Sequence, residues 1–247
     1  MPPCTRNHNE TTMAPSFRGK CAVITGGNKG IGFAICQGLL AAKFDVFVAA
    51  RSIDKAKDAV EKLNSSNAHP IELDVSDDNS IDAAAKHLRQ QIDSLDVLIN
   101  NAGIYPDKGV NILTASRELL LQTMNVNAFG AVRVTQALLS LLIKSAAARV
   151  VNTSSGYGQL DGLSADVPSY CLSKLTLNGA TIMLSEALQS QGIIVNAIDP
   201  GWVATDMGGN SASRTPEQGA DTAIWLATEA PVNLSGKLFH ARRSVPF

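Results

Sequence analysis

The sequence predicts an α/β protein in which a single, doubly wound parallel sheet carries helices on both faces. Short apolar runs alternate along the chain with longer segments of helix-like character, and this alternation is typical of βαβ crossovers in a parallel sheet. A glycine-rich segment directly follows the first apolar run, at the position where such sheets bind nucleotides. No break in composition and no internal repeat divides the chain, so we expect one domain.

The expected strands and helices follow from these runs and the turn signals between them. Six runs are predicted to be strands, in the order Cys21–Thr25, Val46–Ala50, Ile71–Leu73, Val97–Ile99, Val150–Asn152 and Ile193–Ile198. The first helix is expected to begin near Ile31. A later helix has a clear start at Thr215-Pro216-Glu217-Gln218, with a capping Thr, a Pro at the first helical position and a Gln at the third. The Gly/Ser-rich Asp206–Arg214 before it is predicted to be a loop, and Lys237–His240 an edge strand.

We place the domain at residues 18–247. Composition indicates in which compartment it works and which partners it does not bind. Residues 1–16 are polar and lack the apolar core of a signal peptide, so we expect a disordered extension over residues 1–17 of a cytoplasmic protein. The four cysteines form no CxxC pair, and a chain of this size needs no disulfide framework. The net charge of −1 argues against a nucleic-acid or membrane partner. The four histidines lack the spacing of metal ligands, so no metal is predicted.

The segment Thr25–Gly32, TGGNKGIG, lies between the first strand and its helix. Its glycines let the backbone approach a pyrophosphate closely, and the helix N-terminus supplies free N–H groups for the same anion. A tight turn also uses glycines, so the motif alone is a modest signal. Its position in the first βαβ unit favours a dinucleotide site in a sheet of Rossmann type.

The residues after the second strand indicate which dinucleotide is used. Sheets that prefer NAD place an acidic residue there to bind the ribose 2′-hydroxyl, but this chain has Ala50-Arg51. A second cation, Lys29, lies inside the glycine-rich loop. Two cations without an acid suit a 2′-phosphate, so NADPH is predicted over NADH. The alternative is that Arg51 is a solvated charge at a strand end.

Tyr170 and Lys174 stand four residues apart, which places them on one face of a helix. A tyrosine titrates near ~10, and a neighbouring ammonium stabilises its phenolate and lowers the pKa. Such a pair occurs by chance in many helices, but here it follows the segment Asn152–Gly158, NTSSGYG, after a strand. A serine at that place can hydrogen-bond a substrate carbonyl and polarise it; the alternative is a serine-rich turn.

With these residues in place, the chain resembles the short-chain dehydrogenase/reductase family, and within it the NADPH-dependent carbonyl reductases. Seven motifs carry the resemblance in order: TGGNKGIG (25–32), LDV (73–75), NNAG (100–103), NVNAFG (125–130), NTSSGYG (152–158), YCLSK (170–174) and DPGWVATDMGG (199–209). Seven motifs in the right order are far more specific than any one of them. They run over most of the predicted domain, from about Arg18 to His240.

The resemblance implies a set of site residues. The catalytic residues are Asn127, which organises a proton relay, Ser155, Tyr170 as proton donor, and Lys174, which also binds the nicotinamide ribose. The cofactor-binding residues are Gly26, Asn28, Lys29, Gly30, Ile31, Gly32, Arg51, Asp74, Val75, Asn101, Gly103, Tyr170, Lys174, Pro200, Gly201, Val203 and Thr205. Asp74 and Val75 would contact the adenine. The carboxamide would be held by Pro200, Gly201, Val203 and Thr205.

The chain departs from some monomeric carbonyl reductases, which carry a long insertion between the catalytic serine and tyrosine. Here Ser155 and Tyr170 are only 15 positions apart. The segments Ala128–Ile143 and Tyr170–Leu188 are also more apolar than contact with the sheet requires. In related oligomers these two helices pack against their copies, so we expect a homodimer or homotetramer.

The predicted function is transfer of a hydride from NADPH to a small-molecule carbonyl (an aldehyde, a ketone or a quinone), with the alcohol as product. Specificity is expected in the loops Tyr105–Asn111, Gly156–Val167 and Asp206–Arg214, because loops at strand ends build such pockets. One alternative is a catalytically inactive NADPH-binding module with a sensing or partner-binding role, since fold alone does not define function. Another is a sugar-nucleotide epimerase or dehydratase, although these usually have a larger C-terminal substrate region.

Overall fold

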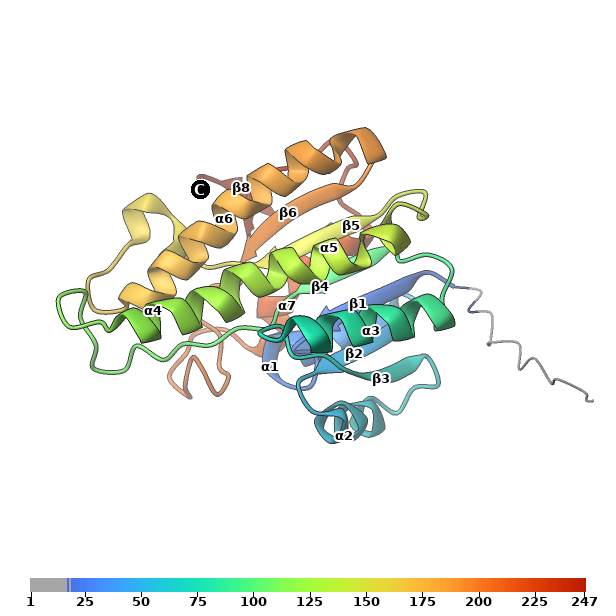
Figure 1. Cartoon of the computed structure of the whole chain (residues 1–247), viewed down its shortest axis with the longest axis horizontal. Helices are drawn as coiled ribbons and strands as arrows, with labels where there is room; N and C mark the ends of the chain where they lie inside the picture. The colour runs from blue at the N-terminus through green and yellow to red at the C-terminus, as the bar shows by residue number, and fades with distance from the viewer. Residues whose placement is uncertain (1–16, 18) are drawn as a thin grey trace, which may run out of the picture.

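A computed structural model describes Phe17 and residues 19–247. Its eight strands form one sheet in the order β3-β2-β1-β4-β5-β6-β7-β8 (Figure 1). The strands are β1 (Cys21–Thr25), β2 (Asp45–Ala50), β3 (Ala68–Glu72), β4 (Val97–Asn100), β5 (Arg149–Thr153), β6 (Ile194–Asp199), β7 (Leu238–His240) and β8 (Arg243–Val245). All neighbouring pairs are parallel except β7 with β8. The predicted fold class, a doubly wound parallel sheet, is therefore confirmed.

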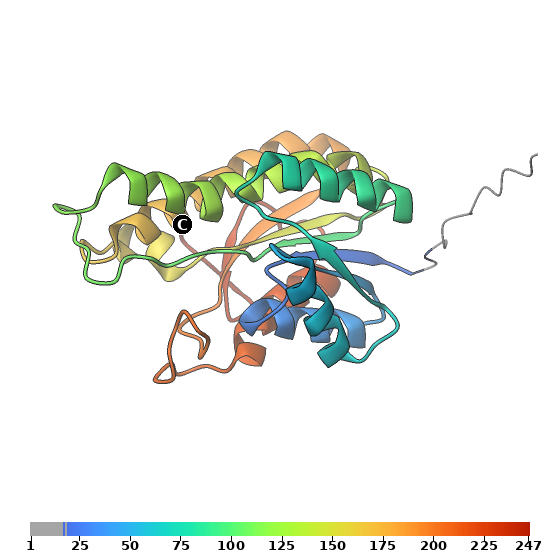
Figure 2. The same ribbon diagram turned by 60° about the horizontal axis from the view of Figure 1, so that its bottom comes forward.

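Helices cover both faces of this sheet, as Figure 2 shows. They are α1 (Gly30–Ala41), α2 (Ile53–Leu63), α3 (Asp78–Gln91), α4 (Arg117–Met124), α5 (Gly130–Leu142), α6 (Pro168–Leu188) and α7 (Pro216–Thr228). One apolar core joins the sheet to α3, α5 and the end of α6. A second core joins the opposite face to α1, α2 and α7. The strand order reverses between β1 and β4, and such a reversal opens a crevice at the carboxyl ends of the strands.

Most element boundaries agree with the sequence predictions. β1 matches Cys21–Thr25 residue for residue, and α7 begins with the predicted capping box between Thr215 and Gln218. The exception among the six predicted strands is β3, which begins at Ala68 and includes Pro70. A proline argues against a strand interior because it has no N–H, but an edge strand tolerates it. β3 is an edge strand of the sheet.

The strand predicted at Lys237–His240 is present as β7, but its predicted place at the edge of the sheet is wrong, because β8 lies outside it. The two strands are joined by the two-residue turn Ala241-Arg242, whose φ angles are +47° and +62°. Two-residue hairpins with both residues in the left-handed region usually contain Asn or Gly. Here Arg242 is held from the side: its N–H donates to Thr222 Oγ1 at 3.1 Å, and its guanidinium Nε donates to Asp221 Oδ2 at 2.8 Å.

At the other end of the chain, the ring of Phe17 packs edge-on against Phe47 and His69, with centroid distances of 5.7 and 4.9 Å. The remainder of the predicted N-terminal extension, residues 1–16, lies outside the described residues, as does residue 18 at the start of the predicted domain. Over the described part of the chain, no helix combines the length and the apolar character needed to cross a bilayer.

Candidate active site

Four of the predicted site segments meet where parallel strands end. The glycine-rich loop follows β1, Asn101–Gly103 follows β4, Ser154-Ser155 follows β5, and Pro200-Gly201 follows β6. Because β1, β4, β5 and β6 are consecutive in the sheet, these segments lie at one edge. The sheet topology thus brings together the predicted cofactor-binding and catalytic segments.

The glycine-rich loop has the close packing that its sequence predicts. Gly26 and Gly30 have φ angles of +62° and +55°, in the region that favours glycine. A Cβ on Gly32 would lie 2.3 Å from the carbonyl oxygen of Gly26 and 2.5 Å from Asn101 Nδ2, so a side chain there does not fit. Asn101 Nδ2 also donates to the carbonyl oxygens of Thr25 and Gly26, at 3.1 and 3.2 Å.

Helix α1 begins directly behind this loop. Its N-cap residue, Lys29, makes no side-chain cap hydrogen bond, and its first turn contains no acidic residue. The N–H groups of that first turn are therefore free to meet an anion. The helix end is free, and the glycines in front of it leave no room for side chains. This arrangement fits the pyrophosphate of a dinucleotide. Asn28 and Ile31 lie in the same loop.

The two predicted 2′-phosphate ligands are both at the surface. Arg51 directly follows β2 and is exposed, whereas Ala50 is buried. Lys29 Nζ lies 2.6 Å from Asp206 Oδ2, an exposed ion pair that lowers the pKa of the Asp206 carboxyl. The pair joins the glycine-rich loop to the predicted substrate loop.

The remaining predicted cofactor residues border the same edge of the sheet. Asp74 follows β3 and accepts hydrogen bonds from Ser76 N and Ser76 Oγ on its Oδ1, at 2.9 and 2.6 Å. Val75 is buried next to it. After β6, Gly201 has a φ angle of +73°. The segment then continues through Val203 to Thr205, which lies against the glycine-rich loop. A Cβ on Gly30 would lie 3.1 Å from Thr205 Cγ2.

Helix α6 carries Tyr170 and Lys174, and the ammonium nitrogen lies 5.4 Å from the centroid of the tyrosine ring. Lys174 is 3% exposed, and its Nζ donates to the carbonyl oxygen of Thr153 at 2.7 Å. Burial lowers the pKa of Lys174 to about 8. The two side chains therefore form a buried pair directly beside the end of β5.

The expected lowering of the Tyr170 pKa is not what the structure gives. Burial raises the pKa of the phenol above its ordinary value, while the hydroxyl of Ser155 acts in the opposite direction. Lys174 Nζ lies over the ring of Tyr170, 5.4 Å from its centroid, and its charge does not offset the effect of burial on the pKa of the phenol. A phenol that keeps its proton at neutral pH is nevertheless what a proton donor requires.

Asn127 lies in a π-helical turn, Asn125–Phe129, between α4 and α5. Its Oδ1 accepts from the N–H of Ile104 at 2.8 Å, and its Nδ2 donates to Ile104 O and Ser173 Oγ at 2.9 and 3.0 Å. A Cβ on Gly103 would lie 3.3 Å from Asn127 Oδ1 and 3.7 Å from Lys174 Nζ. Asn127 and Lys174 therefore both border Gly103, and π-helical turns often occur at functional sites.

The structure separates the two serines after β5. Ser154 is buried, and its Oγ donates to Asn178 Oδ1 at 2.6 Å. Ser155 is partly exposed, and its Oγ accepts from the N–H of Tyr157 at 3.2 Å. Of the two serines, Ser155 is the one whose hydroxyl acts on the phenol of Tyr170.

Two aromatic rings from the predicted specificity loops flank Tyr170. The rings of Tyr105 and Tyr157 stand edge-on to it, with centroid distances of 5.1 and 6.3 Å. Both side chains are partly exposed, at 38% and 43%. They surround the ring of Tyr170 with aromatic side chains.

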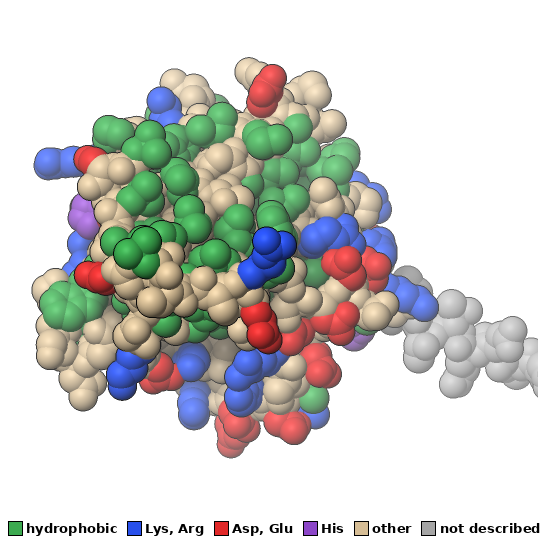
Figure 3. All heavy atoms as spheres, turned by 60° about the vertical axis from the view of Figure 1, so that its left-hand side comes forward, with side chains coloured by type: hydrophobic (Ala, Val, Ile, Leu, Met, Phe, Trp, Pro, Cys, Tyr) green, Lys and Arg blue, Asp and Glu red, His purple; other side chains and the backbone are tan. Residues whose placement is uncertain are grey.

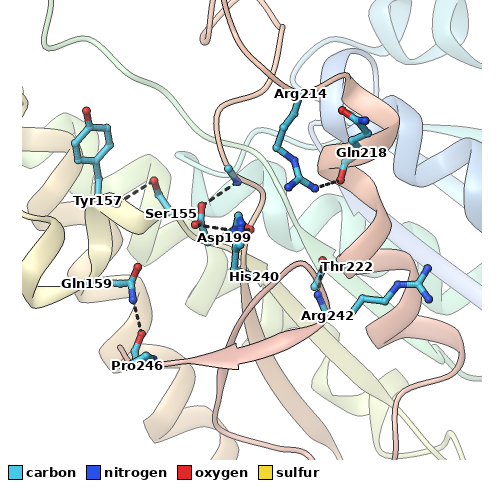
Figure 4. A network of polar contacts seen from close by, with 11 residues as sticks. Ser155, Tyr157, Gln159, Asp199, Arg214, Gln218, Thr222, His240, Arg242 and Pro246 are labelled. Carbon is cyan, nitrogen blue, oxygen red and sulfur yellow. Dashed lines mark hydrogen bonds and ion pairs between the residues drawn. The ribbon is translucent and has the colours of Figure 1, made fainter.

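One polar pair at the site was missed by sequence reasoning. Asp199, the last residue of β6, pairs through Oδ2 with His240 Nδ1 at 3.1 Å, and its Oδ1 accepts from the N–H of Gly201 at 3.0 Å (Figure 4). A Cβ on Gly156 would lie 3.5 Å from Asp199 Oδ2, so the carboxylate lies next to the serine loop. Asp199 stands in a motif that we quoted, but its partner is 41 residues away, and no local pattern reveals the pair.

Comparison with known proteins agrees with this geometry. A family model described as "short chain dehydrogenase" matches residues 20–216. The short-chain dehydrogenase anuI of Penicillium roqueforti (strain FM164) is 37% identical over 233 residues, covering 87% of this chain and 92% of the relative. Carbonyl reductase (NADPH) 1 of Bos taurus is 33% identical over 254 residues, covering 83% of this chain and 90% of the relative.

Among solved structures, the NADPH-bound carbonyl reductase from chicken fatty liver superimposes with a TM-score of 0.84 at 28% identity, covering 94% of this chain and all of that one. The carbonyl reductase Sniffer of D. melanogaster gives a TM-score of 0.80 at 30% identity, covering 89% and 95%. The chain therefore belongs to the short-chain dehydrogenase family of oxidoreductases, and within it resembles the carbonyl reductases.

Proposed function

We propose that this protein is an NADPH-dependent carbonyl reductase that converts an aldehyde, ketone or quinone into the corresponding hydroxyl compound. The observation that carries the proposal is the arrangement around Tyr170: a protonated phenol, a serine hydroxyl on one side and a buried ammonium on the other. The carbonyl reductases among the relatives support the same reaction class.

The side chains of this chain divide the chemistry between them. Bound NADPH supplies the hydride, and Ser155 donates a hydrogen bond to the substrate oxygen, which polarises the carbonyl. Tyr170 gives its phenolic proton to the oxygen as charge develops there. Lys174 then stabilises the phenolate and returns a proton to it, a step favoured because burial has lowered the pKa of this ammonium to about 8.

Cofactor choice rests on the exposed cations. A 2′-phosphate carries more negative charge than the single carboxylate of Asp206, so it would compete for Lys29 and also engage Arg51. No acid follows β2 to bind a free 2′-hydroxyl, because Ala50 occupies that place. These contacts support NADPH, as does the NADPH-bound carbonyl reductase with the same fold.

The substrate we propose is an apolar or aromatic carbonyl compound of small-molecule size. Hydrophobic side chains gather on the side of the molecule where α4 and α6 begin (Figure 3). The predicted specificity loops and their continuations contribute exposed apolar residues there, namely Tyr105, Ile112, Leu113, Tyr157, Leu160, Leu163 and Met207. An apolar lining with few polar groups is typical of small-molecule sites.

The test is NADPH oxidation against a panel of aldehydes, ketones and quinones, together with NADPH and NADH binding by fluorescence titration. We expect turnover with at least one apolar aromatic carbonyl and tighter binding of NADPH. Binding of NADPH without turnover of any carbonyl would instead favour the inactive binding module. Conversion of a sugar nucleotide without net NADPH consumption would favour the epimerase alternative.

We also propose a homodimer or homotetramer in the cytoplasm. Exposed apolar side chains lie along α4–α5 and α6, at Leu121, Phe129, Ile143, Leu172, Ile182 and Met183. Pairing of these helices with their copies across a two-fold axis would bury them. Light scattering at micromolar concentration measures the assembly, and a mass near the single-chain 26.0 kDa would contradict it.

A further inference from the structure

Asp107 is a buried carboxylate in the loop between β4 and α4, and the reaction described above does not use it. The residue is 1% exposed, and none of the ion pairs among the described residues includes it. A buried charge is costly unless hydrogen bonds satisfy it. The bonds that Asp107 makes therefore indicate what the carboxylate is for.

All three of these bonds come from the first turn of α6. Asp107 Oδ1 accepts from the N–H of Ser169 at 2.9 Å, and Oδ2 accepts from the N–H of Tyr170 and from Ser169 Oγ, each at 2.9 Å. The helix has no cap of its own, because Val167 at the N-cap position offers no side-chain oxygen and Pro168 has no N–H. A carboxylate 62 residues earlier in the chain thus takes over the role of a helix cap.

The same loop also holds the predicted relay residue. Asn127 binds the backbone of Ile104 through both its oxygen and its nitrogen, only three residues before Asp107. A hydrogen bond of 3.0 Å between Ser169 Oγ and Thr123 Oγ1 connects this first turn to α4 as well. The loop therefore connects Asn127 to the start of the helix that carries Tyr170 and Lys174.

We propose that Asp107 is a positioning residue for carbonyl reduction: its carboxylate fixes the first turn of α6 against the loop after β4, and thereby fixes the Tyr170 hydroxyl relative to Ser155. This inference rests on the reductase function proposed above. A neutral side chain does not replace the carboxylate, because three donors converge on its two oxygens and an asparagine offers only one acceptor. A displacement of about 1 Å at a reacting group is enough to cost roughly 10²-fold in rate.

The experiment compares Asp107→Asn with the unaltered protein in three measurements: kcat, the Kd for NADPH, and hydrogen exchange at the Ser169 and Tyr170 amides. We expect kcat to fall by roughly 10- to 100-fold, the Kd to change by less than about threefold, and the two amides to exchange faster. Asp77→Ala is the matched control. Asp77 caps α3 by accepting from the N–H of Asn79 at 2.9 Å, but it is exposed and α3 contains no site residue, so kcat should not change.

Introducing a local cap separates positioning from simple helix capping. In the double variant Asp107→Asn/Val167→Ser, the new hydroxyl can cap α6 without connecting it to the loop after β4. We expect slow amide exchange to return while kcat stays low. Full recovery of kcat would overturn the proposal, because it would show that any cap suffices.

Other outcomes also decide the matter. Unchanged amide exchange in Asp107→Asn overturns the proposal even if no carbonyl is ever reduced, whereas an inactive unaltered protein by itself overturns only the proposed function. Should Asp107→Asn fail to fold, Ser169→Ala removes one of the three bonds. An unchanged kcat in that variant counts against the proposal, and a severalfold fall supports it.

Discussion

The interior of the site and its rim are held in different ways. In the interior, Lys174, Asn127 and Ser154 are almost fully buried, and each makes short hydrogen bonds to partners on other elements. At the rim, Lys29, Asp206 and the tyrosines of the specificity loops are exposed. Buried polar networks define one geometry, whereas exposed ion pairs are screened and weak. We infer that the interior sets the chemistry, and the rim selects which cofactor and substrate take part.

The largest expected effect is in the interior. Tyr170→Phe keeps the ring between Tyr105 and Tyr157 but removes the proton donor. General acid catalysis is typically worth ~10²–10⁴-fold, so kcat should fall by about that factor. Fluorescence titration should show that NADPH still binds with a similar Kd. A variant that kept most of its activity would show that the interior does not set the chemistry in the way inferred here.

The next effect tests the glycine-rich loop, which lies between interior and rim. Gly32→Ala would place a Cβ 2.3 Å from the Gly26 carbonyl oxygen, so the loop must shift. We expect the affinity for NADPH to fall by ~10²-fold, measured by titration, because the backbone no longer approaches the pyrophosphate. Gly179→Ala in α6 is the control: its Cβ would meet nothing within 4 Å, and it should leave the affinity unchanged.

The third effect is a pH dependence that originates in the interior. Burial lowers the pKa of Lys174 from 10.5 to about 8, so the ammonium is present below pH 8 and is lost above it. Carbonyl reduction needs that proton, so kcat/KM for NADPH, which reports groups of the free enzyme, should fall about tenfold per pH unit above 8. Arginine keeps its charge at high pH, so Lys174→Arg should shift the fall in kcat/KM to a higher pH. Lys144→Arg, at an exposed site, should leave the pH of that fall unchanged.

The smallest effect is expected at the rim. Ala50→Asp together with Arg51→Ala introduces an acid for the 2′-hydroxyl and removes one of the two cations that we propose bind the 2′-phosphate. The ratio of kcat/KM for NADPH to that for NADH should fall by about tenfold, since charge-assisted hydrogen bonds are worth ~1.5–3 kcal/mol and exposure reduces this. Asp206→Asn frees Lys29 and should improve NADPH use slightly. Equal use of both cofactors by the unaltered protein would contradict the assignment of the rim cations.

Local signals in the sequence predict the sheet and the site segments well. Cys21–Thr25 is apolar throughout and followed by glycines, and the strand lies there; Thr215 and Gln218 form the capping box that their spacing predicts. Features that depend on distant residues were missed or misplaced. β8 is short and polar, and the turn before it contacts Asp221 and Thr222, about 20 residues earlier in the chain. Asp107 and Asp199 owe their positions to partners 62 and 41 residues away, which no local periodicity reveals.

The same limit applies to electrostatics. The i, i+4 spacing correctly places Tyr170 and Lys174 on one face of α6, but spacing does not show how deeply the pair is buried. Burial depends on β5 and on the loops that cover the helix, and it reverses the expected direction of the Tyr170 pKa shift. Sequence therefore identifies the participants, while the packing around them determines their protonation.

The C-terminal hairpin has a practical consequence for anyone who produces this protein. Gln159, four residues after Ser155, donates from Nε2 to the carbonyl oxygen of Pro246 at 2.8 Å (Figure 4), so the penultimate residue of the chain touches the serine loop. An affinity tag or fusion partner joined after Phe247 would begin one residue beyond this contact. We expect it to disturb the loop that carries Ser155 and so to change kcat.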